Sequence, residues 1–177
     1  VRLASVVLAT AMGTVVPLAA QAASSTPDSA GETLLTGGQL AHYLAVKKAL
    51  NPYLASNPAL VQAARSTGHT PVIQAGGQQV RVGVFDYLNL VKQDTALAAI
   101  FTKNNFAPSQ FEPTQLAAYT ALLALVENEA AGTALPEAST VLGKNVALVK
   151  VHRQELAAVG VALRVNRGTD GNDDLDP

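Results

Sequence analysis

Hydrophobic residues recur every three or four positions along most of the chain between residues 36 and 165, which is the spacing of one face of an α-helix. We expect helices over about 39–50, 58–66, 84–103, 113–131 and 139–159. Short connections containing Gly or Pro separate them. The pattern therefore predicts an all-α fold, an antiparallel bundle of about four to five helices.

Several boundaries of these helices are marked by capping residues. Asn57 before Pro58 predicts a helix start, because Asn caps free N–H groups and Pro fits the first turn. The same pair at Asn51 and Pro52 predicts a short turn or kink after the first helix. A break is also expected near Asp94 within the stretch 84–103.

The segment 70–83 departs from the helical pattern. β-Branched residues flank Gly76 and Gly77, and Val80 and Val82 alternate with polar residues. This pattern fits a small β-hairpin, and it fits an irregular loop equally well, since an isolated hairpin is marginally stable in water.

The ends of the chain differ from the helical body. Residues 1–22 have one cation, Arg2, then an apolar run and the small-residue triplet Ala20-Gln21-Ala22, so they predict a signal peptide cleaved after Ala22. We expect a disordered linker at 23–35, a helical domain at 36–165 and a disordered acidic tail at 166–177. The protein would then be periplasmic or secreted, with no integral membrane span after cleavage.

Composition narrows the classes of chemistry. The 177 residues include no Cys, which excludes disulfides, thiolate metal sites and thiol nucleophiles. Twelve Lys and Arg against thirteen Asp and Glu give no overall basic field, so we expect no nucleic-acid partner. Within this balance the helical body is slightly cationic, and Lys47, Lys48, Lys150 and Arg153 are expected to be solvated.

The sequence carries no recognisable catalytic motif, so catalytic residues stay unknown, and no metal or cofactor is expected. His152 and Asn145 lie two turns apart on the apolar stripe of the helix predicted at 139–159. Together with Tyr43, Tyr87 and Tyr119 they would form a ligand site if the fold brought them together. The alternative is that Asn145 and His152 satisfy local buried hydrogen bonds.

Three segments carry a family resemblance: NPALVQAAR at 57–65, the run from Phe101 to Gly132, and NVALVKVHRQEL at 145–156. Through them the chain resembles small exported bacterial helical proteins of unknown function. The resemblance implies a helical, exported protein and supplies no activity, cofactor or site residue.

These observations favour a non-catalytic binding or interaction module in the periplasm, with an unknown protein or small molecule as its partner. The alternative is a metal- or small-ligand-dependent enzyme that uses His152 with Glu155.

Overall fold

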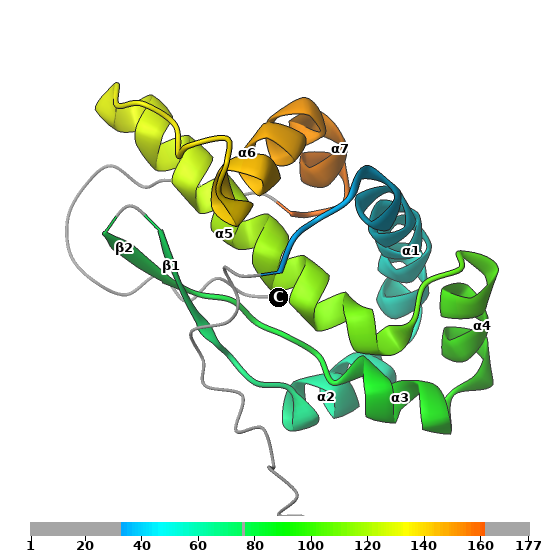
Figure 1. Cartoon of the computed structure of the whole chain (residues 1–177). Helices are drawn as coiled ribbons and strands as arrows, with labels where there is room; N and C mark the ends of the chain where they lie inside the picture. The colour runs from blue at the N-terminus through cyan, green and yellow to red at the C-terminus, as the bar shows by residue number, and fades with distance from the viewer. Residues whose placement is uncertain (1–32, 76, 162–177) are drawn as a thin grey trace, which may run out of the picture.

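Helix α5, Phe111–Ala131, runs through the middle of the protein, and the other elements pack around it (Figure 1). The computed structural model describes residues 33–75 and 77–161. Between Thr114 and Leu125 nearly every side chain of α5 is buried, including the polar Gln115 and Thr120. A helix buried on all sides has neighbours all round, so α5 organises the fold.

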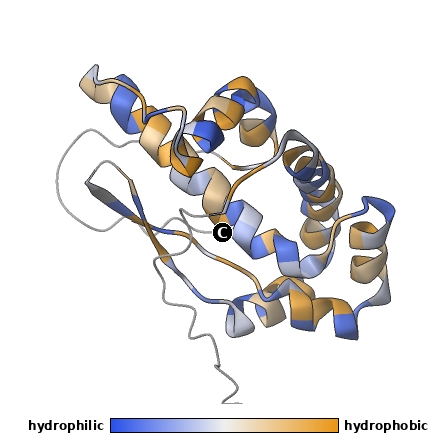
Figure 2. Cartoon of the chain, viewed as in Figure 1, coloured by the Kyte–Doolittle hydropathy of each residue, from blue (hydrophilic) through white to orange (hydrophobic). Residues whose placement is uncertain are grey.

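The remaining helices and strands lie around α5. They are α1 (Gly37–Ala55), α2 (Pro58–Thr67), β1 (Val72–Ala75), β2 (Gln78–Arg81), α3 (Tyr87–Gln93), α4 (Thr95–Lys103), the short 3-10 turn η2 (Pro108–Gln110), α6 (Val141–Val151) and α7 (Arg153–Ala158). Helix α6 lies along the C-terminal half of α5, whereas α1, α3 and α4 gather around its N-terminal half (Figure 1). Figure 2 shows hydrophobic and hydrophilic residues alternating around the outer helices, as expected for helices that bury one face.

The expected helical class is confirmed, because the described residues are mostly helical with one small antiparallel sheet. An antiparallel bundle of four to five helices is not confirmed by this arrangement. No helix within 33–75 or 77–161 is both long enough and apolar enough to cross a membrane. The predicted signal peptide at 1–22 and the acidic tail at 166–177 fall outside the described residues.

Helix α1 is longer than the sequence pattern predicts, because it continues through Asn51 and Pro52 to Ala55. Pro52 removes one helical N–H and leaves the carbonyl four residues earlier, on the exposed Lys48, without its helical partner. The helix still completes its last turn, with Leu50 fully buried just before the proline. Helix α2 begins at Pro58, as the Asn57–Pro58 pair predicts.

The segment 70–83 forms the hairpin rather than the loop. Strands β1 and β2 pair antiparallel with Ile73 opposite Val80, and Gly77 in the turn has φ +94°. Ile73 and Ala75 are buried, and β1 packs on α5 (Figure 1). The contact with α5 explains why a two-stranded sheet persists here.

Two of the predicted helices are interrupted. Asp94 ends α3 and begins α4, and its carboxylate accepts the N–H of Leu97 at 2.9 Å. This is the break expected near Asp94. The stretch 139–159 was expected to be one helix but bends at His152, whose ψ of 14° departs from helical geometry, so that it divides into α6 and α7.

An aromatic cluster fills the space between α1, α3, α4 and the start of α5. Phe111 lies at its centre, with ring centroids 4.5 Å from Tyr87 and 5.1 Å from Tyr43. Phe101 and Phe106 also contact it. Aromatic residues make up only 5% of the sequence, yet five of them meet at this one place in the core.

Candidate functional site

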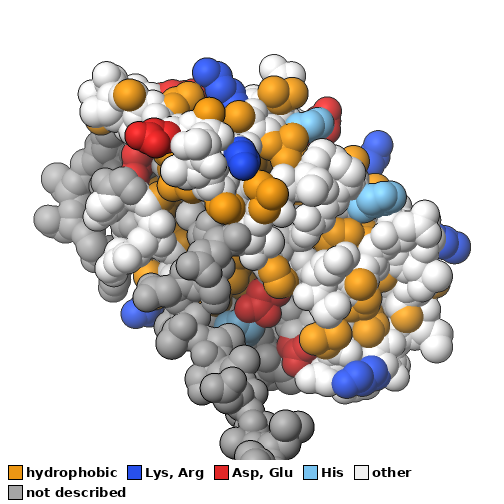
Figure 3. Space-filling view, viewed as in Figure 1, with side chains coloured by type: hydrophobic (Ala, Val, Ile, Leu, Met, Phe, Trp, Pro, Cys, Tyr) orange, Lys and Arg blue, Asp and Glu red, His pale blue; other side chains and the backbone are white. Residues whose placement is uncertain are grey.

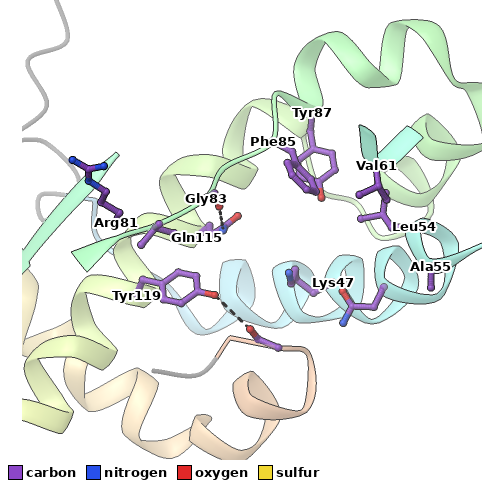
Figure 4. A pocket seen from close by; sticks show the side chains of 13 residues that line it. Lys47, Leu54, Ala55, Val61, Arg81, Gly83, Phe85, Tyr87, Gln115 and Tyr119 are labelled. Carbon is purple, nitrogen blue, oxygen red and sulfur yellow. Dashed lines mark hydrogen bonds between the residues drawn. The ribbon is translucent and has the colours of Figure 1, made fainter. Parts of the chain in front are cut away.

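A cavity of about 350 Å³ opens between α1, the segment after β2, and α5. This volume lies at the lower end of the range for small-molecule sites, about 300–1,000 Å³. Aliphatic, aromatic, amide and cationic side chains line it (Figure 4), and the full set is Lys47, Asn51, Leu54, Ala55, Val61, Arg81, Val82, Gly83, Phe85, Tyr87, Gln115, Tyr119 and Gly160.

The wall formed by α1 follows from helical periodicity. Tyr43, Lys47 and Asn51 are spaced four residues apart, so they share one face of the helix. Tyr43 is fully buried at one end of this face, Lys47 is half-buried, and Asn51 donates its amide N–H to the carbonyl of Val159 at 3.1 Å. The same helix therefore contributes both core and cavity.

Lys47 is the charged group directed into the cavity, whereas the guanidinium of Arg81 points away from the other labelled side chains (Figure 4). Burial lowers the pKa of Lys47 below the usual 10.5. In the described part of the chain its ammonium has no hydrogen bond or ion pair, and no Asp or Glu lines the cavity. The cavity is therefore electropositive.

The amide of Gln115 and the phenol of Tyr119, both on α5, complete the polar lining. Gln115 donates its side-chain N–H to the carbonyl of Gly83 at 3.1 Å, which fixes the segment after β2 against α5. The Tyr119 hydroxyl lies 3.4 Å from the carbonyl of Gly160 (Figure 4). Burial raises the pKa of Tyr119 and of Tyr87. Both phenols are therefore protonated hydrogen-bond donors over the whole physiological range.

Two of the five predicted site residues, Tyr87 and Tyr119, line this cavity. Tyr43 is not part of the lining and lies one turn before Lys47 on α1. Burial raises the pKa of its hydroxyl, which has no hydrogen-bond partner among the described residues.

Asn145 does not line the cavity and instead holds the segment that leads into α1. Its side-chain oxygen accepts the N–H of Leu35 at 2.8 Å, and its amide N–H donates to the carbonyl of Thr33 at 2.8 Å. Asn145 is 1% exposed and Leu35 is 5% exposed. The end of the linker predicted at 23–35 is therefore packed on the helical domain, through contacts over 110 residues apart in sequence.

His152 lies at the junction of α6 and α7, also outside the cavity lining. Its Nδ1 is 3.1 Å from the carboxylate of Glu155, one turn later. The other histidines make contacts of their own, His42 with the carbonyl of Asn104 and His69 with Glu112, each at 2.8 Å. In 33–75 and 77–161 no three acidic, His or Cys side chains are grouped so that they could hold a metal ion.

The residue that sequence reasoning missed is Lys47, which was grouped with the exposed Lys48 as a solvated cation. The signal was present, because Lys47 continues the apolar spacing of Leu40, Tyr43 and Leu50 while Lys48 does not. Gln115 and Phe85 were not predicted as site residues either, since neither belongs to a sequence motif.

Charged side chains are spread over the face seen in Figure 3 and do not gather into a patch of one sign.

Comparisons of the chain with protein-family models, with curated proteins and with solved structures gave no match. The resemblance to small exported bacterial helical proteins therefore stays a prediction, and the cavity itself is the basis for any functional proposal.

Proposed function

We propose that this protein is a non-catalytic binding module that takes a small molecule into the cavity between α1 and α5. The observation that carries the proposal is the cavity of about 350 Å³, in which two phenols and an amine with no partner among the described residues accompany apolar side chains. Small-molecule sites combine those features: an apolar lining and a few polar groups that fix orientation.

Two polar side chains of the lining are already fixed by hydrogen bonds, which favours binding. Gln115 and Asn51 are each tied to a backbone carbonyl, so they do not have to be ordered when a ligand enters. Preorganised groups lower the entropic cost of association. The same proposal includes a location in the periplasm or outside the cell, which the signal-peptide pattern of residues 1–22 supports.

The alternative function is an enzyme that uses His152. It is supported by the imidazole–carboxylate pair with Glu155, which could hold His152 in one tautomer. Replacing His152 with Asn would abolish turnover or metal uptake under this alternative and leave both unchanged under ours.

The binding proposal is tested by screening soluble fragments against isotope-labelled protein and following the backbone amides of Gly83, Gln115 and Gly160 by NMR. Ala55→Trp places a large side chain at the rim of the cavity, and Ala41→Trp is a matched control on an exposed position of the same helix outside the lining. We expect binders to shift the three amides in the wild type and in Ala41→Trp, and to lose affinity in Ala55→Trp. Fragments that bind equally well to Ala55→Trp would refute the cavity as the site.

A further inference from the structure

We infer that the molecule taken up in this cavity is an amphipathic anion, whose carboxylate or phosphate binds Lys47 and whose apolar body lies against Leu54, Val61 and Phe85. The inference rests on the proposed binding function and adds the chemical class of the ligand. Four observations carry it: the charge of the lining, the free donors, the position of the apolar wall, and the energetic state of Lys47.

The charge of the lining selects an anion. Lys47 and Arg81 are the charged residues of the cavity, and the described lining holds no carboxylate to neutralise either of them. Figure 4 shows the Lys47 amine between the side chains of α5 and those that precede α3, so a ligand in the cavity would meet it directly. A cationic ligand would be repelled by the Lys47 ammonium.

Hydrogen-bond donors also line the cavity. In the described structure the Tyr87 hydroxyl has no hydrogen-bond partner, and the contact of Tyr119 with Gly160 is long at 3.4 Å. A hydroxyl proton rotates to suit its acceptor, so both phenols can turn toward an anion held at Lys47. Charge-assisted hydrogen bonds of this kind are shorter and stronger than neutral ones.

One part of the lining is apolar. Leu54 at the end of α1, Val61 of α2 and Phe85 before α3 lie together away from Gln115 and Tyr119 (Figure 4). A hydrophilic anion such as free phosphate would leave this wall unused, whereas a hydrocarbon body removes it from water. The lining therefore favours a ligand with one charged end and one apolar end.

A bound anion would also stabilise the charged form of the Lys47 amine. Lys47 is partly withdrawn from water without a counter-charge, and this burial lowers its pKa. The titratable groups that line the cavity with it are Arg81 from β2, whose guanidinium points away, Tyr87 from α3 and Tyr119 from α5, and none of them is an acid that would stabilise the ammonium. A bound anion raises the pKa of Lys47 again, so binding takes up protons at alkaline pH and weakens as the amine loses its charge.

The test compares three probes with the same tail: octanoate, octyl phosphate and octanol, each titrated by calorimetry below its critical micelle concentration. The variants are Lys47→Met, which keeps the length of the side chain, and Lys48→Met as the matched control on the neighbouring exposed position. Because a charge-assisted hydrogen bond is worth at least a factor of ten in affinity, we expect an anion to bind about ten-fold more tightly than octanol. Lys47→Met should remove that preference without weakening octanol, and Lys48→Met should retain it.

The outcomes separate this inference from the proposed function. Equal binding of octanol and both anions overturns the anionic class, and an anion preference that survives in Lys47→Met overturns the assignment of the head group to Lys47. If octanol also fails to bind Ala55→Trp in that case, the cavity remains the binding site and the proposed function stands. Equal affinities of all three probes for wild type and Ala55→Trp overturn both. The tighter of the two anions identifies the head group as carboxylate or phosphate.

Discussion

Asn145 offers the sharpest test of how this fold is held together, because one buried amide joins α6 to the segment that precedes α1. Replacing Asn145 with Ala removes both of its 2.8 Å hydrogen bonds, from the N–H of Leu35 and to the carbonyl of Thr33. Nothing nearby in the described structure replaces these contacts for Leu35, whose side chain is 5% exposed.

The size of the effect follows from the burial of the two backbone groups. A buried donor left without a partner costs about 1–3 kcal/mol, which applies to the N–H of Leu35. Thr33 is only half-buried, so water can reach its carbonyl and the loss there is about 0.5–1.5 kcal/mol. We therefore expect Asn145→Ala to lower the free energy of unfolding by about 1.5–4.5 kcal/mol.

The assay is urea unfolding followed by circular dichroism, with hydrogen exchange as a local readout. The midpoint should fall at an unchanged slope. The amides of α5 should lose only the protection that the drop in global stability removes, while the amide of Leu35 should lose more than that. Gln62→Ala serves as the control, because Gln62 is exposed on α2 and its replacement should change stability by less than about 0.5 kcal/mol.

Asn145→Asp adds a dependence on pH. Burial raises the pKa of a carboxyl group, so the variant should approach wild-type stability at acidic pH, where a protonated Asp can still donate to Thr33, and lose it as pH rises through the folded pKa. A change below about 1 kcal/mol in Asn145→Ala, with Leu35 still protected, would refute the tether. Loss of ligand binding at unchanged stability would instead place Asn145 at a ligand.

Three further expectations concern single positions. Gly143→Ala should destabilise by about 3 kcal/mol in thermal unfolding, since its Cβ would lie 2.0 Å from the backbone oxygen of Glu137, whereas Gly38→Ala, with open space around it, should stabilise by about 0.4–1 kcal/mol. The N–H of Leu97 and the Tyr53 hydroxyl lower the pKa of Asp94 below 3.8. The stability that this carboxylate contributes is therefore complete above pH 3.8 and is lost as the pH falls below it. The urea midpoint of Asp94→Asn should consequently fall less on acidification than that of the wild type. Lys47→Met should raise the urea midpoint near neutral pH, because it removes a desolvated charge, and the gain should disappear above the ordinary lysine pKa of 10.5.

The parts of the fold that the sequence predicts well are those governed by local chemistry. Asn57 and Pro58 start α2 because capping and a fixed proline φ act within one turn. Asp94 divides α3 from α4 by the same local rule. Periodicity likewise located α5, although it showed a single stripe where the structure buries the helix on nearly every side.

The parts that it does not predict depend on tertiary contacts. Pro52 is compatible with the end of α1 as well as with a turn, and the hairpin is compatible with a loop until α5 lies beneath it. The candidate site shows the same limit. Tyr87 and Tyr119 were predicted as ligand-binding residues and do share the cavity, whereas Asn145 and His152 lie elsewhere, because a shared helix face does not determine which neighbour covers it.

The distribution of tyrosines has a consequence for spectroscopy. The chain contains no Trp and four Tyr, so its intrinsic ultraviolet fluorescence comes from Tyr43, Tyr53, Tyr87 and Tyr119. These residues belong to α1, α3 and α5, and two of them line the cavity. Emission therefore reports on this half of the protein and on ligand entry, and it reports on α7 only through the contact of Tyr119 with Gly160. Agreement between tyrosine emission and circular dichroism would thus measure whether the two ends of α5 unfold as one cooperative unit.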